Sequence, residues 1–423
     1  MPEEKNQSLR ALDALNFCNA GIQTGLGPFM AIYYTAVRHW HPGQIGVLIA
    51  CQSLSGIAVQ SFAGHAVDES HHKKLLTAAA GLIVASGALG IVMLPSYALQ
   101  IAVQLIIGVA VTIFPATSSA FALGMSRREE VSGRIARNET LTHSGNVAFA
   151  IGAAAVGTFL ALQGIFIEAA LFAAGMIPSV FFINEKHVNY EAARAGDPNN
   201  GGDNGNEAPK RSGWRELASN KNILTFTACV VLYYFANAAT LPLVSEILSR
   251  SSKGHPASRS AAWQVAVMVV VAEAAMVGVA AVSGKLADKW GRKPLFLLGF
   301  GALAVRNAAT VLSHNPYYLI SLQAIDGVAM GIYGVLLTLV TADLSRGSGR
   351  FNFVQGAVQS AMGLGGVLSN SLFGWMARSL GFNASFCGLA MVALGGFTLY
   401  GSKMPETKLE KDERDQAADA AHG

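Results

Sequence analysis

The chain has 423 residues, of which 52% belong to the apolar set AVILMFWYC and only 13% are Asp, Glu, Lys or Arg, with a formal net charge of +4. Typical soluble proteins carry about 25% charged residues, so the composition excludes a soluble protein of this size, as well as collagen-like and intrinsically disordered chains. We therefore predict an all-α polytopic membrane protein.

Runs without Asp, Glu, Lys or Arg locate the membrane-spanning helices, because about 20 apolar residues cross the hydrocarbon core. The runs are continuously apolar rather than alternating, which favours helices over the strands of a β-barrel. One uncharged run, Leu75–Ser126, is long enough for two helices and divides at Pro95 and Ser96. The twelve predicted spans are 13–36, 43–63, 75–94, 97–122, 137–160, 165–183, 222–248, 261–283, 295–313, 317–341, 353–376 and 384–402.

A polar segment separates the first six spans from the last six. Gly196–Asn206 consists almost wholly of Gly, Asn and Asp. Such a segment is too hydrophilic to pack, which predicts a flexible cytoplasmic linker. The predicted organisation is an N-terminal six-helix bundle, a linker, a C-terminal six-helix bundle and a cytoplasmic tail, at residues 1–183, 184–221, 222–402 and 403–423.

The Lys and Arg residues predict the orientation of the spans. Most of the 30 lie in the N-terminal segment, the even-numbered loops, the central segment and the tail, which all fall on one side. Because positive loops stay in the cytoplasm, we expect both termini to be cytoplasmic in a plasma or inner cell membrane. This bias explains the positive net charge without a nucleic-acid partner.

In the fifth span, three polar residues share one helix face. Glu139, His143 and Asn146 lie at i, i+4 and i+7. Because histidine titrates near neutral pH, a Glu–His pair beside a wet cavity suits proton handling. The alternative is a solvated helix start, since Glu139 lies one turn from the cytoplasm.

The second half carries three ionisable residues at membrane depth. Glu273, Arg306 and Asp326 each lie roughly 12–18 Å from the outer face at about 1.5 Å per residue. Charge at this depth is costly and usually marks function or a pair. The three could form one ion cluster with a surplus carboxylate for a proton or a cationic substrate group. The alternative is a static pair of Arg306 with Asp326.

A loop motif repeats between the halves with a nearly constant offset. The segment Gly284–Lys293 resembles the loop signature of the major facilitator superfamily, Gly-x-x-x-Asp-(Arg/Lys)-x-Gly-(Arg/Lys)-(Arg/Lys). The residues that match it are Gly284, Asp288, Lys289, Gly291, Arg292 and Lys293. The first-half copy keeps Gly64 and Asp68, but Glu69 replaces a basic residue.

The resemblance implies two related six-helix bundles around a cavity that opens alternately to either side. We expect Gly284 to allow a close helix contact, and Asp288 to face the N-terminus of the eleventh span and to pair with a loop arginine. We expect Lys289, Arg292 and Lys293 to set the orientation and to share in this contact; the alternative is that these three only set the orientation. In this family the first, fourth, seventh and tenth helices line the cavity. The substrate-cavity candidates are Gln23, Gln104, Asn146, Tyr234 and Asn237.

The sequence thus predicts a proton-coupled secondary transporter of a small organic solute, acting as a monomer in the lipid bilayer. An uncoupled facilitator and a transporter-like sensor are the alternatives. We expect no enzyme activity, cofactor or metal, because no nucleophile–base pair, metal-ligand spacing or phosphate-binding loop is visible. The four cysteines lie in apolar stretches and predict no disulfide.

Overall fold

The structure is a computed structural model, and it describes residues 2–23, 29–30, 33–34, 36–159, 161–195, 220–251 and 257–408. These residues form helices and loops without a strand. The long helices of the first half are α1 (Pro2–Gln23), α3 (Pro42–Glu69), α4 (Lys73–Met93), α5 (Tyr97–Val111), α6 (Ile113–Met125), α7 (Val131–Phe159) and α8 (Leu162–Phe181). Those of the second half are α11 (Lys221–Ala238), α12 (Thr240–Ser251), α13 (Ala257–Trp290), α14 (Arg292–Thr310), α15 (Pro316–Leu344), α16 (Phe351–Ser379) and α17 (Phe382–Lys403).

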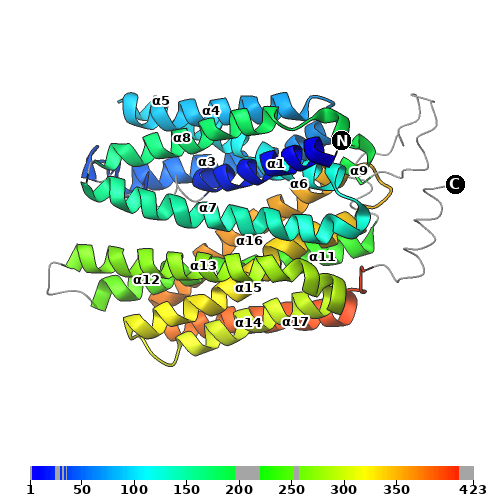
Figure 1. Cartoon of the computed structure of the whole chain (residues 1–423). Helices are drawn as coiled ribbons and strands as arrows, with labels where there is room; N and C mark the ends of the chain where they lie inside the picture. The colour runs from blue at the N-terminus through cyan, green and yellow to red at the C-terminus, as the bar shows by residue number, and fades with distance from the viewer. Residues whose placement is uncertain are drawn as a thin grey trace.

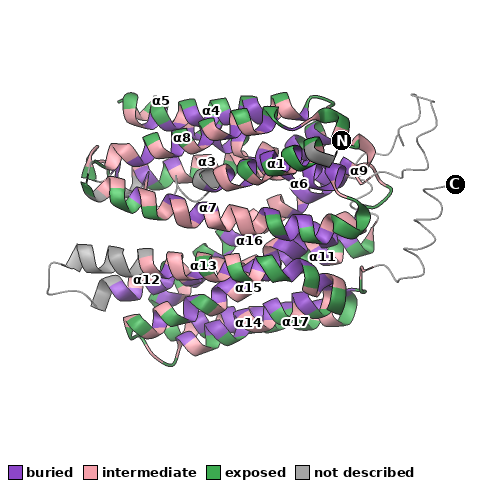
Figure 2. Ribbon diagram, viewed as in Figure 1, coloured by how far each residue is buried: buried purple, intermediate pink, exposed green. Residues whose placement is uncertain are grey.

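The helices run side by side in two groups that follow the two halves of the sequence (Figure 1). The start of α1 and the end of α17 lie at the same end of the molecule, which we call the terminal end. Each group has its own apolar core, and large apolar side chains such as Leu75, Leu171 and Leu364 are more than half exposed on the outside. Figure 2 shows the buried contacts between helices and the exposed outer faces. An apolar outer face is what a helix bundle presents to the lipid of a membrane.

Two of the predicted spans are each made of two helices. The fourth span divides between α5 and α6, and the seventh divides between α11 and α12. In both, a proline stands four residues after the last residue of the preceding helix: Pro115 follows Val111, and Pro242 follows Ala238. A proline ring clashes with the carbonyl four residues before it and lacks an N–H donor, which explains both breaks.

Hydropathy identifies some spans more readily than others. Eight stretches of the described chain are long and apolar enough to cross a membrane. The predicted spans in α7, α14 and α16 are not among them, and the first predicted span extends beyond the described residues. Helix α7 carries Glu139, His143 and Asn146, and α14 carries Arg306. The polar residues that lower hydropathy in α7 and α14 thus include several that the sequence marks as candidates for function.

The start of the predicted linker differs from expectation. It contains a 3-10 turn, Glu185–His187, and the short helix α9 (Tyr190–Ala193), because Asn184 and Asn189 accept backbone N–H bonds at their starts. The turn after α9 then reaches the second half: Gly347 donates its N–H to Ala195 at 2.7 Å, and Phe351 donates to Arg194 at 3.1 Å. Residues 196–219 lie outside the described residues.

Candidate functional site

A polar cluster joins the two bundles between α7 and α13. His143 Nδ1 lies 2.7 Å from Glu273 Oε2, and Asn146 Nδ2 donates to both carboxylate oxygens of Glu273 at 3.2 Å. The side chains of His143 and Glu273 are 14% and 12% exposed. The helix face predicted from the i, i+4, i+7 spacing therefore meets an intramembrane carboxylate of the other half.

Glu139 extends this cluster towards α15. Its Oε2 lies 3.9 Å from His143 Nε2, so one imidazole stands between two carboxylates. Glu139 also packs against Gly334 of α15, where an added Cβ would lie 2.8 Å from Oε2. Two carboxyl groups and one imidazole this close together can exchange a proton. Each such exchange changes the hydrogen bonds between them, and so the contact between the bundles.

The other two intramembrane charges form a separate pair. Arg306 of α14 hydrogen-bonds Asp326 of α15, and it also donates to Thr240 at 2.8 Å and to Asn307 at 3.0 Å. These bonds join Arg306 to Asp326 and not to Glu273, although Glu273 lies near enough to Asp326 for the two carboxylates to interact electrostatically. Glu273 faces α7 of the first half, whereas Asp326 faces α14 within the second half.

The cavity candidates lie in different surroundings. Gln104 is fully buried near Tyr34, whose hydroxyl donates to Gln100 at 2.7 Å. This places Gln104 in the packed interior of the first bundle.

Two further candidates lie on α11. Tyr234 is half-buried against Gly366 of α16. Asn237 is also half-buried, and its Oδ1 is buried without a hydrogen-bond partner in the described part of the chain. The side chain of Gln23 lies outside the described residues.

At the terminal end, the second-half motif binds the start of α7. Asp288 accepts a bond from Ser132 at 2.7 Å and from Arg292 at 2.9 Å, and Arg292 also donates to Ser132 at 3.2 Å and to Asp343 at 3.2 Å. The expected pairing of Asp288 with a loop arginine is present. Its expected position at the eleventh span is wrong, because its partner in the other half is on α7.

The first-half motif occupies the place that we expected for Asp288. Asp68 accepts the backbone N–H groups of Asn352 at 3.2 Å and Phe353 at 2.9 Å, and the side chain of Asn352 at 2.7 Å. These groups form the first turn of α16, the eleventh span, where a carboxylate is stabilised by the exposed N–H groups and the helix dipole. Each motif therefore reaches across to the opposite half.

Both motif glycines stand at close helix contacts. A Cβ at Gly64 would lie 2.0 Å from the carbonyl oxygen of Asn352, and one at Gly284 would lie 2.5 Å from that of Ser132. No side chain fits at these distances, so glycine allows α3 to approach α16 and α13 to approach α7. Together with Asp68 and Asp288, these contacts close the molecule at its terminal end.

The remaining motif residues shape the loop between α13 and α14. Gly291 has a φ of 102°, a left-handed conformation that favours glycine. Glu406, which follows α17, accepts the backbone N–H groups of Arg292 at 2.8 Å and Lys293 at 3.0 Å and so caps α14. Lys289 is exposed.

Sequence reasoning did not single out Ser132, Asn352 or Glu406 as partners at this end. Ser132 belongs to a Ser-Gly-Arg triplet, Ser132–Arg134, that recurs at Ser348–Arg350, and this was the available signal. The other two carried none, since their role follows from contacts between distant helices. Among the described residues, no group of three or more His, Cys, Asp or Glu is arranged to hold a metal ion.

Comparisons with known proteins agree with this architecture. A family model described as the Major Facilitator Superfamily matches residues 12–305 and 229–422. Two uncharacterized MFS-type transporters of Mycobacterium tuberculosis, strains CDC 1551 / Oshkosh and ATCC 25618 / H37Rv, are each 36% identical over 399 residues, which cover 94% of this chain and 93% of theirs. The multidrug transporter protein MdtP of Bacillus subtilis (strain 168) is 30% identical over 105 residues, 25% of this chain and 19% of that protein.

A solved structure extends the likeness to the fold of the whole chain. The MFS proton:xylose symporter XylE bound to 6-bromo-6-deoxy-D-glucose matches with a TM-score of 0.67 and covers 96% of both chains. At 13% sequence identity this likeness concerns the fold alone. The loop motif, the paired bundles and these matches together show that the chain belongs to the major facilitator superfamily of membrane transporters.

Proposed function

We propose that this transporter moves a small organic solute by alternating access and couples the movement to protons. The observation that carries the proposal is the contact of His143 and Asn146 with Glu273 across the bundle interface. A carboxylate at membrane depth is costly unless it is paired or protonated, and here its partners belong to the other bundle. Its protonation state therefore bears on how firmly the bundles are joined.

The mechanism follows from what a proton does to these bonds. Ionised Glu273 accepts bonds from His143 and Asn146, and such charge-assisted bonds are roughly twice as strong as neutral ones. A proton on Glu273 removes the negative charge that both donors contact, which weakens the link between α7 and α13. Glu139, on the other side of the imidazole, is placed to take up or supply that proton. Proton binding and bundle movement are thereby linked.

A polar, hydrogen-bonding solute suits the remaining candidates. Asn237 has a buried acceptor without a partner, and Tyr234 lies on the same helix three residues before it. A solute that donates a hydrogen bond to Asn237 would relieve the cost of that unpaired oxygen. Rocking of the two bundles would then expose the solute to each side in turn.

We also propose that the terminal end faces the cytoplasm of a cell membrane and that the chain works as a monomer. Within the described ranges, the basic loops before α4, α7, α14 and α16 lie at this end, as the positive-inside rule requires. The contacts of Asp68 and Asp288 would then close the cytoplasmic side in this conformer, so the solute would next be exchanged with the outside.

The test uses the purified chain in proteoliposomes with a solute found by thermal-shift screening of a metabolite and drug library. Under an imposed proton gradient, we expect accumulation of the solute together with a change in lumenal pH. Glu273→Gln and His143→Ala should each abolish gradient-driven accumulation, since each removes one partner of the contact between α7 and α13, while the melting temperature changes little.

A matched control is Glu129→Gln, which neutralises an exposed glutamate in the turn before α7, outside the cluster. It should leave coupling intact. Accumulation that a protonophore does not abolish would indicate an uncoupled facilitator, and binding without flux would indicate a sensor. Wild-type coupling in both Glu273→Gln and His143→Ala would reject the proposal.

A further inference from the structure

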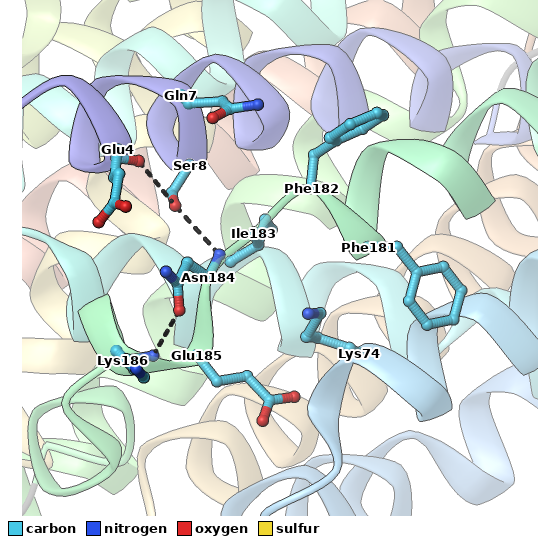
Figure 3. A pocket seen from close by; sticks show the side chains of 10 residues that line it. All are labelled: Glu4, Gln7, Ser8, Lys74, Phe181, Phe182, Ile183, Asn184, Glu185 and Lys186. Carbon is cyan, nitrogen blue, oxygen red and sulfur yellow. Dashed lines mark hydrogen bonds between the residues drawn. The ribbon is translucent and has the colours of Figure 1, made fainter.

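A pocket lies apart from the bundle interface, at the terminal end of the first bundle. Its volume is about 570 Å³, and its walls come from the start of α1, the start of α4 and the end of α8 with the turn that follows (Figure 3). Four of its lining residues carry charge: Glu4, Lys74, Glu185 and Lys186. None of these four belongs to the cluster around Glu273 or to the contacts that close the terminal end.

The pocket has a fixed polar wall. Asn184 donates its N–H to Ser8 Oγ at 3.0 Å, and its side chain accepts the N–H of Lys186 at 3.1 Å. These bonds, drawn in Figure 3, tie the turn after α8 to α1. Within the described ranges, Lys74, Glu185 and Lys186 form no ion pair, whereas Glu4 lies 4.0 Å from His187. Two amines and one carboxylate are thus available to a ligand.

The rim of the pocket is apolar and faces outwards. Phe181 and Phe182 are 56% and 62% exposed, and Leu75, beside Lys74, is 63% exposed. Lys74 Nζ stands 5.9 Å from the ring centroid of Phe181. Exposed aromatic rings beside lysine ammonium groups at the end of a spanning helix mark the depth where acyl chains meet headgroups. The pocket is therefore open to a lipid rather than to the solute path.

We propose that this pocket binds the headgroup of a phospholipid that carries both a phosphate and a primary amine. Lys74 and Lys186 supply two positive charges for the phosphate, as basic pockets near membrane surfaces do. Glu185 supplies a carboxylate for the ammonium group. The acyl chains lie along the exposed Phe181 and Leu75.

The charges of the pocket decide between headgroups. A purely anionic headgroup would satisfy Lys74 and Lys186 but would leave the Glu185 carboxylate without a cation. A choline headgroup has a cation but no N–H to donate to that carboxylate. A headgroup with phosphate and primary amine satisfies both signs of charge. The inference does not depend on proton coupling, since no residue of the pocket belongs to that cluster.

The test measures lipid retention on the purified full chain by native mass spectrometry, with phosphatidylethanolamine, phosphatidylglycerol and phosphatidylcholine offered at equal concentration. We expect phosphatidylethanolamine to be retained preferentially. The double variant Lys74→Gln/Lys186→Gln should weaken its retention at least about tenfold, because both phosphate partners are lost. Glu185→Gln should remove the preference over phosphatidylglycerol. Lys403→Gln, an exposed lysine of the same end outside the pocket, is the matched control and should change nothing.

A second measurement does not rely on variants. A photoreactive phosphatidylethanolamine should label peptides from the start of α4 and the turn after α8 in the wild-type chain, and soluble phosphoethanolamine in excess should compete weakly. Labelling spread evenly over the bundle, or equal retention of the three lipids, would overturn the proposal. Equal binding of soluble phosphoethanolamine would show a site for a free metabolite instead of a lipid.

Discussion

At the scale of single residues, the two motif glycines matter because of the backbone that faces them. A Cβ added at Gly284 would lie 2.5 Å from the carbonyl oxygen of Ser132. A Cβ added at Gly278, on the same helix α13, would have no atom within 4 Å. A methyl group at these two positions therefore has opposite consequences. One separates two helices, and the other meets open space.

We predict that Gly284→Ala shifts the population away from the conformer closed at the terminal end, while Gly278→Ala does not. Spin labels on Glu129→Cys and Lys289→Cys, two exposed positions on opposite halves, would report the distance by pulsed electron resonance. A longer mean distance in Gly284→Ala alone is expected. An unchanged distribution in Gly284→Ala would contradict the role of this contact.

The residue scale also shows what the sequence could specify. The spacing of Glu139, His143 and Asn146 predicts one helix face, because a helix of known period fixes which residues lie together. That Glu273 rather than Asp326 meets this face was not predictable, since it depends on the rotation of α13 and α15 in the packed bundle. Likewise, Asp68 binds α16 and Asp288 binds α7, each in the opposite half. A local sequence pattern does not specify such contacts between distant helices.

At the scale of elements, the buried pair of Arg306 and Asp326 ties α14 to α15, and Thr240 adds α12. The Arg306 side chain is 2% exposed and that of Asp326 is 12% exposed. Removing one partner of a buried ion pair leaves an uncompensated charge, whereas replacing both with apolar residues is often neutral. The pair is thus open to a test that separates a structural role from a role in coupling.

We predict that Arg306→Met alone lowers the free energy of unfolding by about 3–5 kcal/mol and that Arg306→Met/Asp326→Leu recovers most of it. Denaturant titration in detergent would measure both. The double variant should retain proton-driven transport if the pair is structural. A stable double variant without proton-driven transport would instead place Asp326 in the coupling mechanism.

At the scale of the whole molecule, the two bundles meet along a second seam between α3 and α16. Gln60 hydrogen-bonds Gln359, and Ser360 donates to the carbonyl of Ile57 at 2.9 Å. Gly356 has Gln60 so near that a Cβ would lie 2.4 Å from its carbonyl oxygen. A transporter that rocks its halves must separate these surfaces in each cycle.

We predict that linking Gln60→Cys to Gln359→Cys with a short thiol crosslinker stops transport and that cleavage of the link restores it. The background should lack the four native cysteines, and Gln60→Cys alone serves as the control. Transport that continues at full rate in the crosslinked protein would refute alternating access by bundle movement.

Sequence reasoning was most successful at this largest scale. The all-helical membrane fold and the family followed from charge-free runs and from one repeated loop motif. The start of the linker was harder to predict from the sequence. Asn184 and Asn189 are residues typical of linkers, but here each accepts a backbone N–H bond at the start of a short helical turn. Their effect depends on the neighbouring α6 and on the loop before α16, to which the chain after α9 is bonded.

The contacts of Asp68 and Asp288 at the terminal end differ in the kind of partner group that they bind. Asp68 accepts mostly backbone N–H groups, which every residue except proline supplies. The residues at the start of α16 can therefore be replaced without loss of these bonds. Asp288 relies on the hydroxyl of Ser132 and the guanidinium of Arg292, and a single replacement there removes a bond. The two contacts therefore differ in their sensitivity to mutation. The contact of Asp68 depends on the position of the backbone, and that of Asp288 depends on the identity of the partner side chains.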